Sequence, residues 1–324
     1  MRIPDYLKYK YDQSSKEDQQ IFDHLYFDLS YKIYGRGDHF AWHGKFSWKN
    51  YASRKLVLSY KNIKKKKVNS INSGPLILSN AYHNFNLELE KLGYQVFHPP
   101  WYDPLHANYS PASLNIAQEC YEMRNKISQK TVNEILQPEF FNEVREFKKK
   151  LKDYFSQLNF SAAFFPNDIC FFESIAVSIL KELKIASLII IHGLPAGYSE
   201  EENRSVDYLL VWGDEIKKNY VEHGFKAENI FVSGHPNYLQ LYKGDLRSDL
   251  SQVLVLGQSF NACFVKEVNL GDCGNLILYT EMIKNALRSL GVKKARLRPH
   301  PSMSKKFYHE FIDLNFFEID AIRI

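Results

Sequence analysis

The feature of the sequence that most limits its fold is a series of short apolar runs that alternate with amphipathic stretches. Residues 160–168 (FSAAFFPND) are an apolar run that ends in polar residues, and residues 186–193 (ASLIIIHG) are almost wholly apolar. Both lack the alternation of a strand with one wet face. Such runs predict strands that are covered on both faces, as in parallel sheets. Residues 173–184 (ESIAVSILKELK), which lie between them, have the spacing of an amphipathic helix. This order of strand, helix and strand predicts an α/β fold.

The same order continues in both directions along the chain. Residues 75–82 and 94–101 are expected strands on either side of a helix that Gly93 ends, which makes one βαβ unit. A helical stretch follows from residue 111 to 158, with Pro138 starting its second helix. Further strands are expected at residues 207–213, 229–236, 253–259, 295–301 and 316–320, with helices at 214–224 and 275–291. Alternation over this length favours a doubly wound sheet with right-handed crossovers.

A polar segment at residues 242–252 divides this series into two parts. We therefore expect two Rossmann-like domains, at residues 68–245 and 246–324. Residues 1–67 are expected to form an aromatic and basic extension that packs on the first domain. The second domain is short beside the first, and we expect it to be incomplete.

Charge and cysteine usage argue against several classes of protein. The net charge of +5, from 42 Lys and Arg against 37 Asp and Glu, is small for a dedicated nucleic-acid binder. The four cysteines have no metal-ligand spacing, so neither a zinc site nor a disulfide framework is predicted, and a reducing cytosol is expected.

The sequence also bears on membrane attachment. The N-terminus has no signal-peptide pattern, and the longest apolar run, residues 185–191, is far shorter than the roughly 20 residues of a membrane span. Any membrane contact is therefore expected to be peripheral. The four-lysine run at residues 64–67 is either a solvated loop or a point of contact with anionic lipid.

Polar residues follow five of the expected strands. Ligands of open α/β sheets bind at the carboxyl ends of the strands, so these residues are the candidates for chemistry. They are Asp168, His192, His235, the group Gly257, Gln258 and Ser259, and the group Arg298, His300 and Ser302.

Residues 298–302 (RPHPS) predict a phosphate site. Arg298 and His300 can donate hydrogen bonds to phosphate oxygens, and the helical stretch that follows adds backbone amides. The alternative is a rigid turn, made by Pro299 and Pro301, whose charged groups face water. The small residues at 257–259 (GQS) would let backbone amides approach the same phosphate.

The first domain offers two candidates for a general base. His192 ends an apolar strand and carries an imidazole that titrates near neutral pH, and Asp168 ends the strand before it. The alternatives are a histidine bonded to backbone at a strand end and, for Asp168, a helix N-cap. His235 is either a phosphate donor or part of a structural turn.

Several common motifs are missing. The chain has no GxGxxG after its first strand, no GxxxxGK[ST] and no GxSxG, so a dinucleotide dehydrogenase, a P-loop NTPase and a hydrolase with a nucleophile elbow are unsupported. It also has no DxD, the acidic pair with which many sugar transferases hold a divalent ion. We therefore expect neither a metal ion nor a cofactor.

The order of these segments resembles that of bacterial GT-B glycosyltransferases of surface-polysaccharide assembly. This group includes sialyltransferase-like and polysialyltransferase-like proteins of capsule and lipooligosaccharide synthesis, with the CDP-glycerol polymerases of teichoic acid synthesis more distant. The resemblance covers roughly residues 76–320 and is carried by PND (166–168), LIIIHGLPAGY (188–198), DYLLVWGDEIKKNYVEHG (207–224), NIFVSGHPNY (229–238), VLVLGQS (253–259) and RLRPHPS (296–302).

The resemblance implies a cleft between two domains, with the acceptor on the N-terminal side and a nucleotide-linked donor on the C-terminal side. Residues 257–259 would border the donor phosphates, and Arg298, His300 and Ser302 would neutralise the leaving nucleotide, with His235 as a further phosphate donor. The candidate residues on the acceptor side are His83, Glu200 and Glu201.

The function that follows is metal-independent transfer of a sugar from a nucleotide-sugar to a glycan or lipid-linked glycan. Such a protein is expected in the cytoplasm, with peripheral contact at the inner face of the membrane, and no nucleic-acid partner is expected. Two alternatives stay open: a nucleotide-sugar epimerase of the same fold, and a catalytically inactive subunit of a capsule assembly complex.

Overall fold

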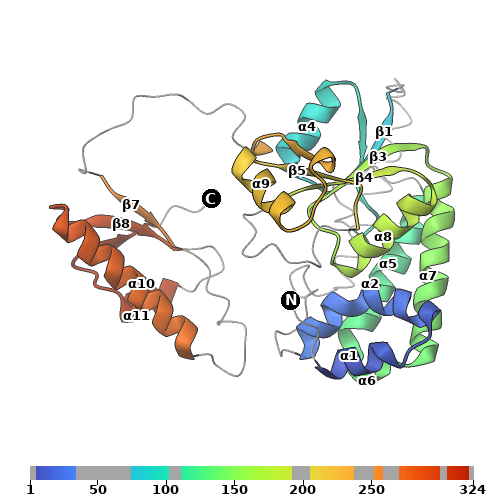
Figure 1. The fold of residues 1–324 in the computed structure, drawn as a ribbon, viewed down its shortest axis with the longest axis horizontal. Helices are drawn as coiled ribbons and strands as arrows, with labels where there is room; N and C mark the ends of the chain where they lie inside the picture. Colours follow the sequence, from blue (N-terminus) through green and yellow to red (C-terminus); the bar gives the residue numbers. More distant parts are fainter. Residues whose placement is uncertain are drawn as a thin grey trace. The chain divides into compact units, whose positions relative to one another are not determined.

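The chain forms two compact units in the computed structural model, which describes residues 5–33, 74–101, 111–191, 205–236, 252–257, 270–299 and 305–320 (Figure 1). The first unit consists of residues 1–33 and 38–241, and the second of residues 34–37 and 242–324. The sequence prediction put the boundary after residue 245. Each unit contains a parallel sheet with helices packed on it, which confirms the predicted α/β class.

The sheet of the first unit has six strands, all parallel, in the order β2-β1-β3-β4-β5-β6. The strands are β1 (Leu76–Ser79), β2 (Gln95–Phe97), β3 (Phe160–Phe165), β4 (Ala186–Ile190), β5 (Tyr208–Val211) and β6 (Ile230–Val232). The chain moves outward from β1 to β2 and then returns to add β3 on the other side of β1. The direction of strand addition therefore reverses between β1 and β3.

Helices cover both faces of this sheet. They are α1 (Asp5–Asp12), α2 (Lys16–Ile33), α4 (His83–Lys91), α5 (Pro111–Gln129), α6 (Val132–Ile135), α7 (Pro138–Ser156), α8 (Phe171–Glu182) and α9 (Asp214–Glu222). Pro138 is the first residue of α7, as predicted, and Gly93 and Gly224 adopt positive φ just after α4 and α9.

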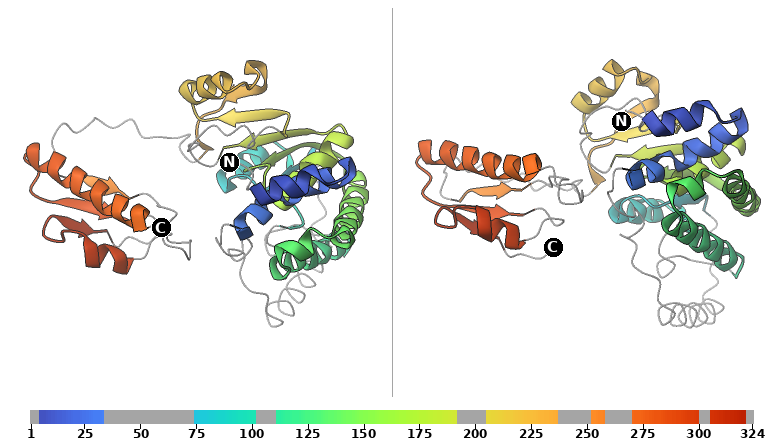
Figure 2. Two further views of the ribbon diagram at one scale, coloured as in Figure 1. Left: turned by 60° about the horizontal axis from the view of Figure 1, so that its bottom comes forward. Right: turned by 90° about the horizontal axis from the view of Figure 1, so that it is seen from below.

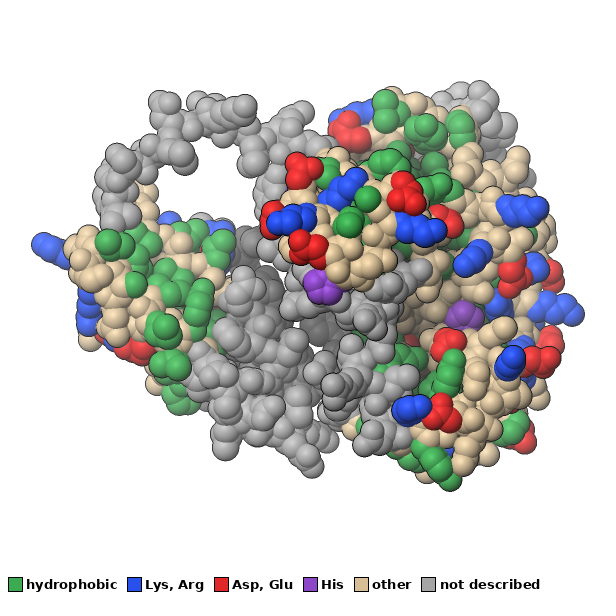
Figure 3. All heavy atoms as spheres, in the orientation of Figure 1, with side chains coloured by type: hydrophobic (Ala, Val, Ile, Leu, Met, Phe, Trp, Pro, Cys, Tyr) green, Lys and Arg blue, Asp and Glu red, His purple; other side chains and the backbone are tan. Residues whose placement is uncertain are grey.

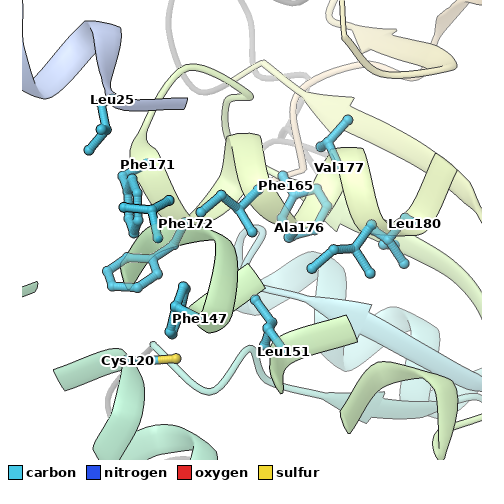
Figure 4. Packing of buried hydrophobic residues seen from close by; sticks show 14 of the residues in the cluster. Leu25, Cys120, Phe147, Leu151, Phe165, Phe171, Phe172, Ala176, Val177 and Leu180 are labelled. Atoms are coloured by element: carbon cyan, nitrogen blue, oxygen red, sulfur yellow. The ribbon is translucent and has the colours of Figure 1, made fainter. Parts of the chain in front are cut away.

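Successive strand residues point to opposite faces of the sheet. Leu78 and Phe165 belong to the large core that α2, α5, α7 and α8 cover, whereas Ile77 and Phe164 pack on the other face with Leu89 of α4. Figure 4 shows the larger core, with side chains of α7 and α8 packed against β3. Burial on both faces explains why the strands read as continuous apolar runs in the sequence.

The N-terminal helices α1 and α2 are part of this core. The sequence analysis expected this segment to pack on the first domain but predicted no helices in it. α2 lies beside α7 and α8 (Figures 1 and 2), and its apolar residues Ile21, Leu25 and Leu29 are four positions apart and buried. Ser15 caps the start of α2 by accepting a hydrogen bond from the backbone N–H of Asp18.

The second unit has a smaller parallel sheet in the order β7-β8-β9. Its strands are β7 (Leu254–Leu256), β8 (Ala295–Arg298) and β9 (Phe317–Ile319), and its helices are α10 (Leu270–Ser289) and α11 (Lys305–Phe311). α10 begins before the predicted residue 275. One face of the sheet contributes Val255, Leu297 and Phe317 to the core. Hydrophobic side chains are also visible over α10 in Figure 3. Leu278 and Met282 of this helix are exposed.

His24 of α2 is a buried imidazole in the first unit. Its ring is 7% exposed, and Nδ1 lies 2.8 Å from the hydroxyl oxygen of Ser174 in α8. Burial, together with the nearby charge of Lys148, lowers the pKa of His24 from its ordinary 6.5 to about 3. The imidazole is therefore neutral in the folded protein at neutral pH.

We expect acid to destabilise the first unit through His24. Below pH 6.5 the unfolded chain binds a proton at this residue and the folded chain does not. The free energy of unfolding should therefore decrease as the pH is lowered, by about 2 kcal/mol between pH 7 and pH 5. Urea unfolding followed by tryptophan fluorescence measures this, since all four tryptophans precede residue 242. His24→Gln should reduce the pH dependence between pH 7 and 5, and the same substitution at the exposed His309 should not.

Candidate functional site

The reversal of strand order between β1 and β3 is the natural place for a ligand site in the first unit. The crossover helices on either side of it, α4 and α8, pack on opposite faces of the sheet. At such a point the segments that follow the two strands diverge, which leaves room at the carboxyl edge. Here those segments are residues 80–82, after β1, and residues 166–170, after β3.

A buried carboxylate ties these segments together. Glu173, in the first turn of α8, is 8% exposed, and its Oε1 accepts hydrogen bonds from Nδ2 of Asn80 (3.0 Å) and Nε1 of Trp101 (2.9 Å). The backbone N–H of Asn80 also donates to the carbonyl of Phe164 in β3. The position of Asn80 is therefore determined by both its backbone and its side chain.

Asn80 presents an unused acceptor at this edge. Its Oδ1 is buried and has no hydrogen-bond partner among the described residues. Buried polar atoms are nearly always paired, so an unpaired one at a strand end is a candidate contact for a ligand group or an ordered water. A hydroxyl or another hydrogen-bond donor would satisfy it.

Asp168 lies beside this network, where the sequence placed it. Its carboxylate is 4% exposed, and Oδ2 accepts a hydrogen bond of 2.8 Å from the backbone N–H of Ser205. The N-cap interpretation of Asp168 is wrong, because the N-cap of α8 is Cys170. Asn167 instead accepts the backbone N–H groups of Ile169 and Cys170 and so forms the turn into α8.

Negative charge gathers at this edge. Burial raises the pKa of the Cys170 thiol well above its ordinary value, and the carboxylates of Glu173, Asp28 and Asp168 raise it further. Cys170 is therefore a neutral thiol at neutral pH rather than a nucleophile. The surroundings disfavour a phosphate here and suit a neutral hydroxyl ligand.

Aromatic rings complete the carboxyl edge of the first sheet. His235, just after β6, lies 5.3 Å from the ring of Tyr82 and 4.4 Å from the ring of Trp212, measured between centroids. The hydroxyl of Tyr82 donates to the carbonyl of Ile191 at the end of β4. Nε1 of Trp212 is buried without a hydrogen-bond partner in the described part of the chain. His235 thus belongs to an aromatic group of the first unit, whereas Gly257 and Arg298 belong to the second.

The carboxyl edge of the second sheet has the opposite charge. Arg298, the last residue of β8, donates from Nε (2.8 Å) and Nη2 (2.6 Å) to Oδ2 of Asp320, which follows β9. Arg296 donates from Nη2 to the other oxygen, Oδ1, at 3.0 Å. The side chain of Asp320 is 1% exposed, so one buried carboxylate holds two guanidinium groups.

Gly257, just after β7, borders the same edge. Its backbone N–H donates to the carbonyl of Arg298 at 2.8 Å, so it is already paired within the unit. A Cβ atom at this position would lie 3.1 Å from that carbonyl and 3.1 Å from the hydroxyl of Tyr308, which explains why a glycine stands here.

The remaining candidates from the sequence are placed as follows. His83 begins α4, as predicted, and is exposed. His192, Glu200, Glu201, Gln258, Ser259, His300 and Ser302 lie outside the described residues. The sequence analysis did not single out Asn80, Glu173, Trp212 and Asp320, although Asn80 and Asp320 are polar residues that directly follow the apolar strands β1 and β9.

The described residues contain neither a metal-binding cluster nor a membrane-spanning helix. No group of three or more His, Cys, Asp or Glu side chains there is arranged to hold a metal ion. None of the helices described is both long and apolar enough to cross a membrane.

Comparisons with known proteins do not identify a family. No protein-family model matches the chain, and no curated protein sequence matches it.

We expect Glu173→Ala to destabilise the first unit by about 3 kcal/mol, because it leaves the Asn80 and Trp101 donors buried without an acceptor. Glu173→Gln keeps one acceptor oxygen and should cost about 1 kcal/mol. Urea unfolding measures both, with Glu215→Ala, at a side chain that is 79% exposed, as the control. Equal stability of the alanine variant and the wild type would contradict this role of Glu173.

Proposed function

We propose that the protein is a glycosyltransferase of the GT-B type, which moves a sugar from a nucleotide-sugar donor to a surface-glycan acceptor. The observation that carries the proposal is the contrast between the two sheets. Carboxylates and aromatic rings gather at the carboxyl edge of the first, and paired arginines at the carboxyl edge of the second. A sugar transferase needs both environments, one for hydroxyl groups and one for phosphate.

The first unit suits the acceptor. Asn80 offers an acceptor oxygen and Trp212 a donor N–H, and a sugar hydroxyl can pair with either. Tyr82 and Trp212 supply apolar ring faces of the kind on which sugar rings pack. We assign Asp168 or His192 as the base that takes the proton of the attacking hydroxyl.

The second unit suits the donor. Arg298 would stabilise the charge that develops on the phosphate as the nucleotide leaves, with His300, Gln258, Ser259 and Ser302 beside it as the sequence implies. Gly257 permits the close approach of other groups to this edge. In this proposal the guanidinium supplies the positive charge, so the reaction needs no metal ion.

The proposal also names partners and a place. The donor is a nucleotide-sugar, and the acceptor is a glycan or a lipid-linked glycan. The enzyme would act in the cytoplasm, in peripheral contact with the inner face of the membrane through basic segments such as residues 64–67.

Asp168→Asn should lower the rate of sugar transfer by about 100-fold or more, because the amide cannot take the hydroxyl proton. Donor binding by calorimetry should be unchanged. The assay offers CMP-, UDP-, GDP- and CDP-linked sugars together with oligosaccharide acceptors and measures the extended product. Asp153→Asn, on α7, is the matched control.

The same assay separates the alternatives. Interconversion of the sugar nucleotide without extension of an acceptor would show an epimerase. Donor binding without turnover under all conditions would show an inactive subunit, and either outcome would overturn the transferase proposal. Full activity of Asp168→Asn would reject Asp168 as the base and leave His192.

A further inference from the structure

We propose that Asp320 is a positioning residue that orients Arg296 and Arg298 as a site for two adjacent phosphate groups. This inference rests on the proposed function and narrows it, because it selects donors linked through a diphosphate over those linked through a single phosphate. Neither Arg296 nor Asp320 is among the candidate site residues named from the sequence.

The hydrogen bonds at Arg298 leave one edge of its guanidinium open. Nε and Nη2, which form the side edge of the group, both donate to Asp320. The other edge, formed by Nη1 and the second hydrogen of Nη2, has no partner among the described residues, and the side chain is 32% exposed. Arginine binds phosphate best through two parallel N–H donors, and this edge provides them.

Arg296 adds a second guanidinium on the same face of the sheet. It lies two residues before Arg298 on β8, so the two side chains point the same way, with Cα atoms about 6.6 Å apart. Its side chain is 51% exposed, and Asp320 contacts it through a single N–H. The two oxygens of one carboxylate therefore draw the two guanidinium groups together.

The charges of this cluster favour an anionic ligand. Arg296, Arg298 and Asp320 together keep a positive charge at the end of β8. The exposed carboxylate of Glu318 lies opposite Arg296 on β9, one residue before the end of that strand. Two neighbouring guanidinium groups match a ligand with two adjacent phosphate groups better than a ligand with a single phosphate group. A diphosphate can therefore contact both arginines, whereas a single phosphate group is expected to contact one.

Asp320 is well placed to hold this geometry. Its side chain is 1% exposed, and its backbone N–H donates to the carbonyl of Leu297 at 2.8 Å, which joins it to β8. Rigid orientation of a charged group before the ligand arrives strengthens binding, because less side-chain entropy is lost. Competition between the carboxylate and the ligand for the guanidinium groups would give mutation of Asp320 the opposite effect.

The test measures the binding of inorganic pyrophosphate and inorganic phosphate to the full chain by calorimetry. The wild type should bind pyrophosphate more tightly than phosphate. Asp320→Asn should raise the Kd for pyrophosphate about tenfold, because the guanidinium edges are no longer fixed. Glu310→Gln, an exposed carboxylate on α11, is the control and should leave the Kd unchanged. Unchanged or tighter binding by Asp320→Asn would overturn the inference.

A second variant tests the site in case Asp320→Asn does not fold. Arg296→Gln removes an exposed guanidinium and should reduce the preference for pyrophosphate over phosphate while its unfolding transition stays like that of the wild type. If Asp320→Asn does not fold, Arg296→Gln carries the test, and an unaltered preference refutes the two-arginine site.

The outcome also separates this inference from the proposed function. Pyrophosphate binding that depends on Asp320, without transfer from any nucleotide-sugar, would reject the transferase and keep the site. Transfer from a CMP-linked sugar, with pyrophosphate binding insensitive to Asp320→Asn, would keep the transferase and reject the site.

Discussion

The structure of the first unit depends on covering both faces of a six-stranded parallel sheet. Parallel strands are joined by crossovers, and the crossover helices bury the sheet from both sides. Because strand addition reverses between β1 and β3, α4 covers one face and α8 the other, and the segments after these strands diverge. The same packing that stabilises the fold thus creates a polar edge where Asn80 and Asp168 stand.

Polar groups at that edge reduce stability unless they are paired. Glu173 is paired with Asn80 and Trp101, and Asp168 with the backbone of Ser205. The amide oxygen of Asn80 and the indole nitrogen of Trp212 are not paired within the described residues. Leaving a buried polar atom without a partner costs free energy. Under the proposed function, a sugar hydroxyl would supply the missing partner.

The two units differ in electrostatic character for local reasons. In the first, buried carboxylates surround the start of α8 and hold the thiol of Cys170 neutral. In the second, a buried carboxylate is present as well, but two arginines outnumber it. In the proposed function, the first unit would bind hydroxyl groups and the second unit phosphate.

The strands, most of the helices and the class of fold can be predicted from the sequence, because burial on both faces imposes apolar runs that can be read directly. The sequence also places Asp168, Gly257 and Arg298 at strand ends. It led us to expect that residues 1–67 pack on the first domain, but it did not predict α1 and α2, since the apolar period at residues 21, 25 and 29 lies among polar residues. Which side chains meet depends on the folded structure. Glu173 contacts Asn80 and Trp101, and Arg298 contacts Asp320, because strand order and register bring distant segments to one edge. Those pairings depend on long-range contacts that no local pattern encodes.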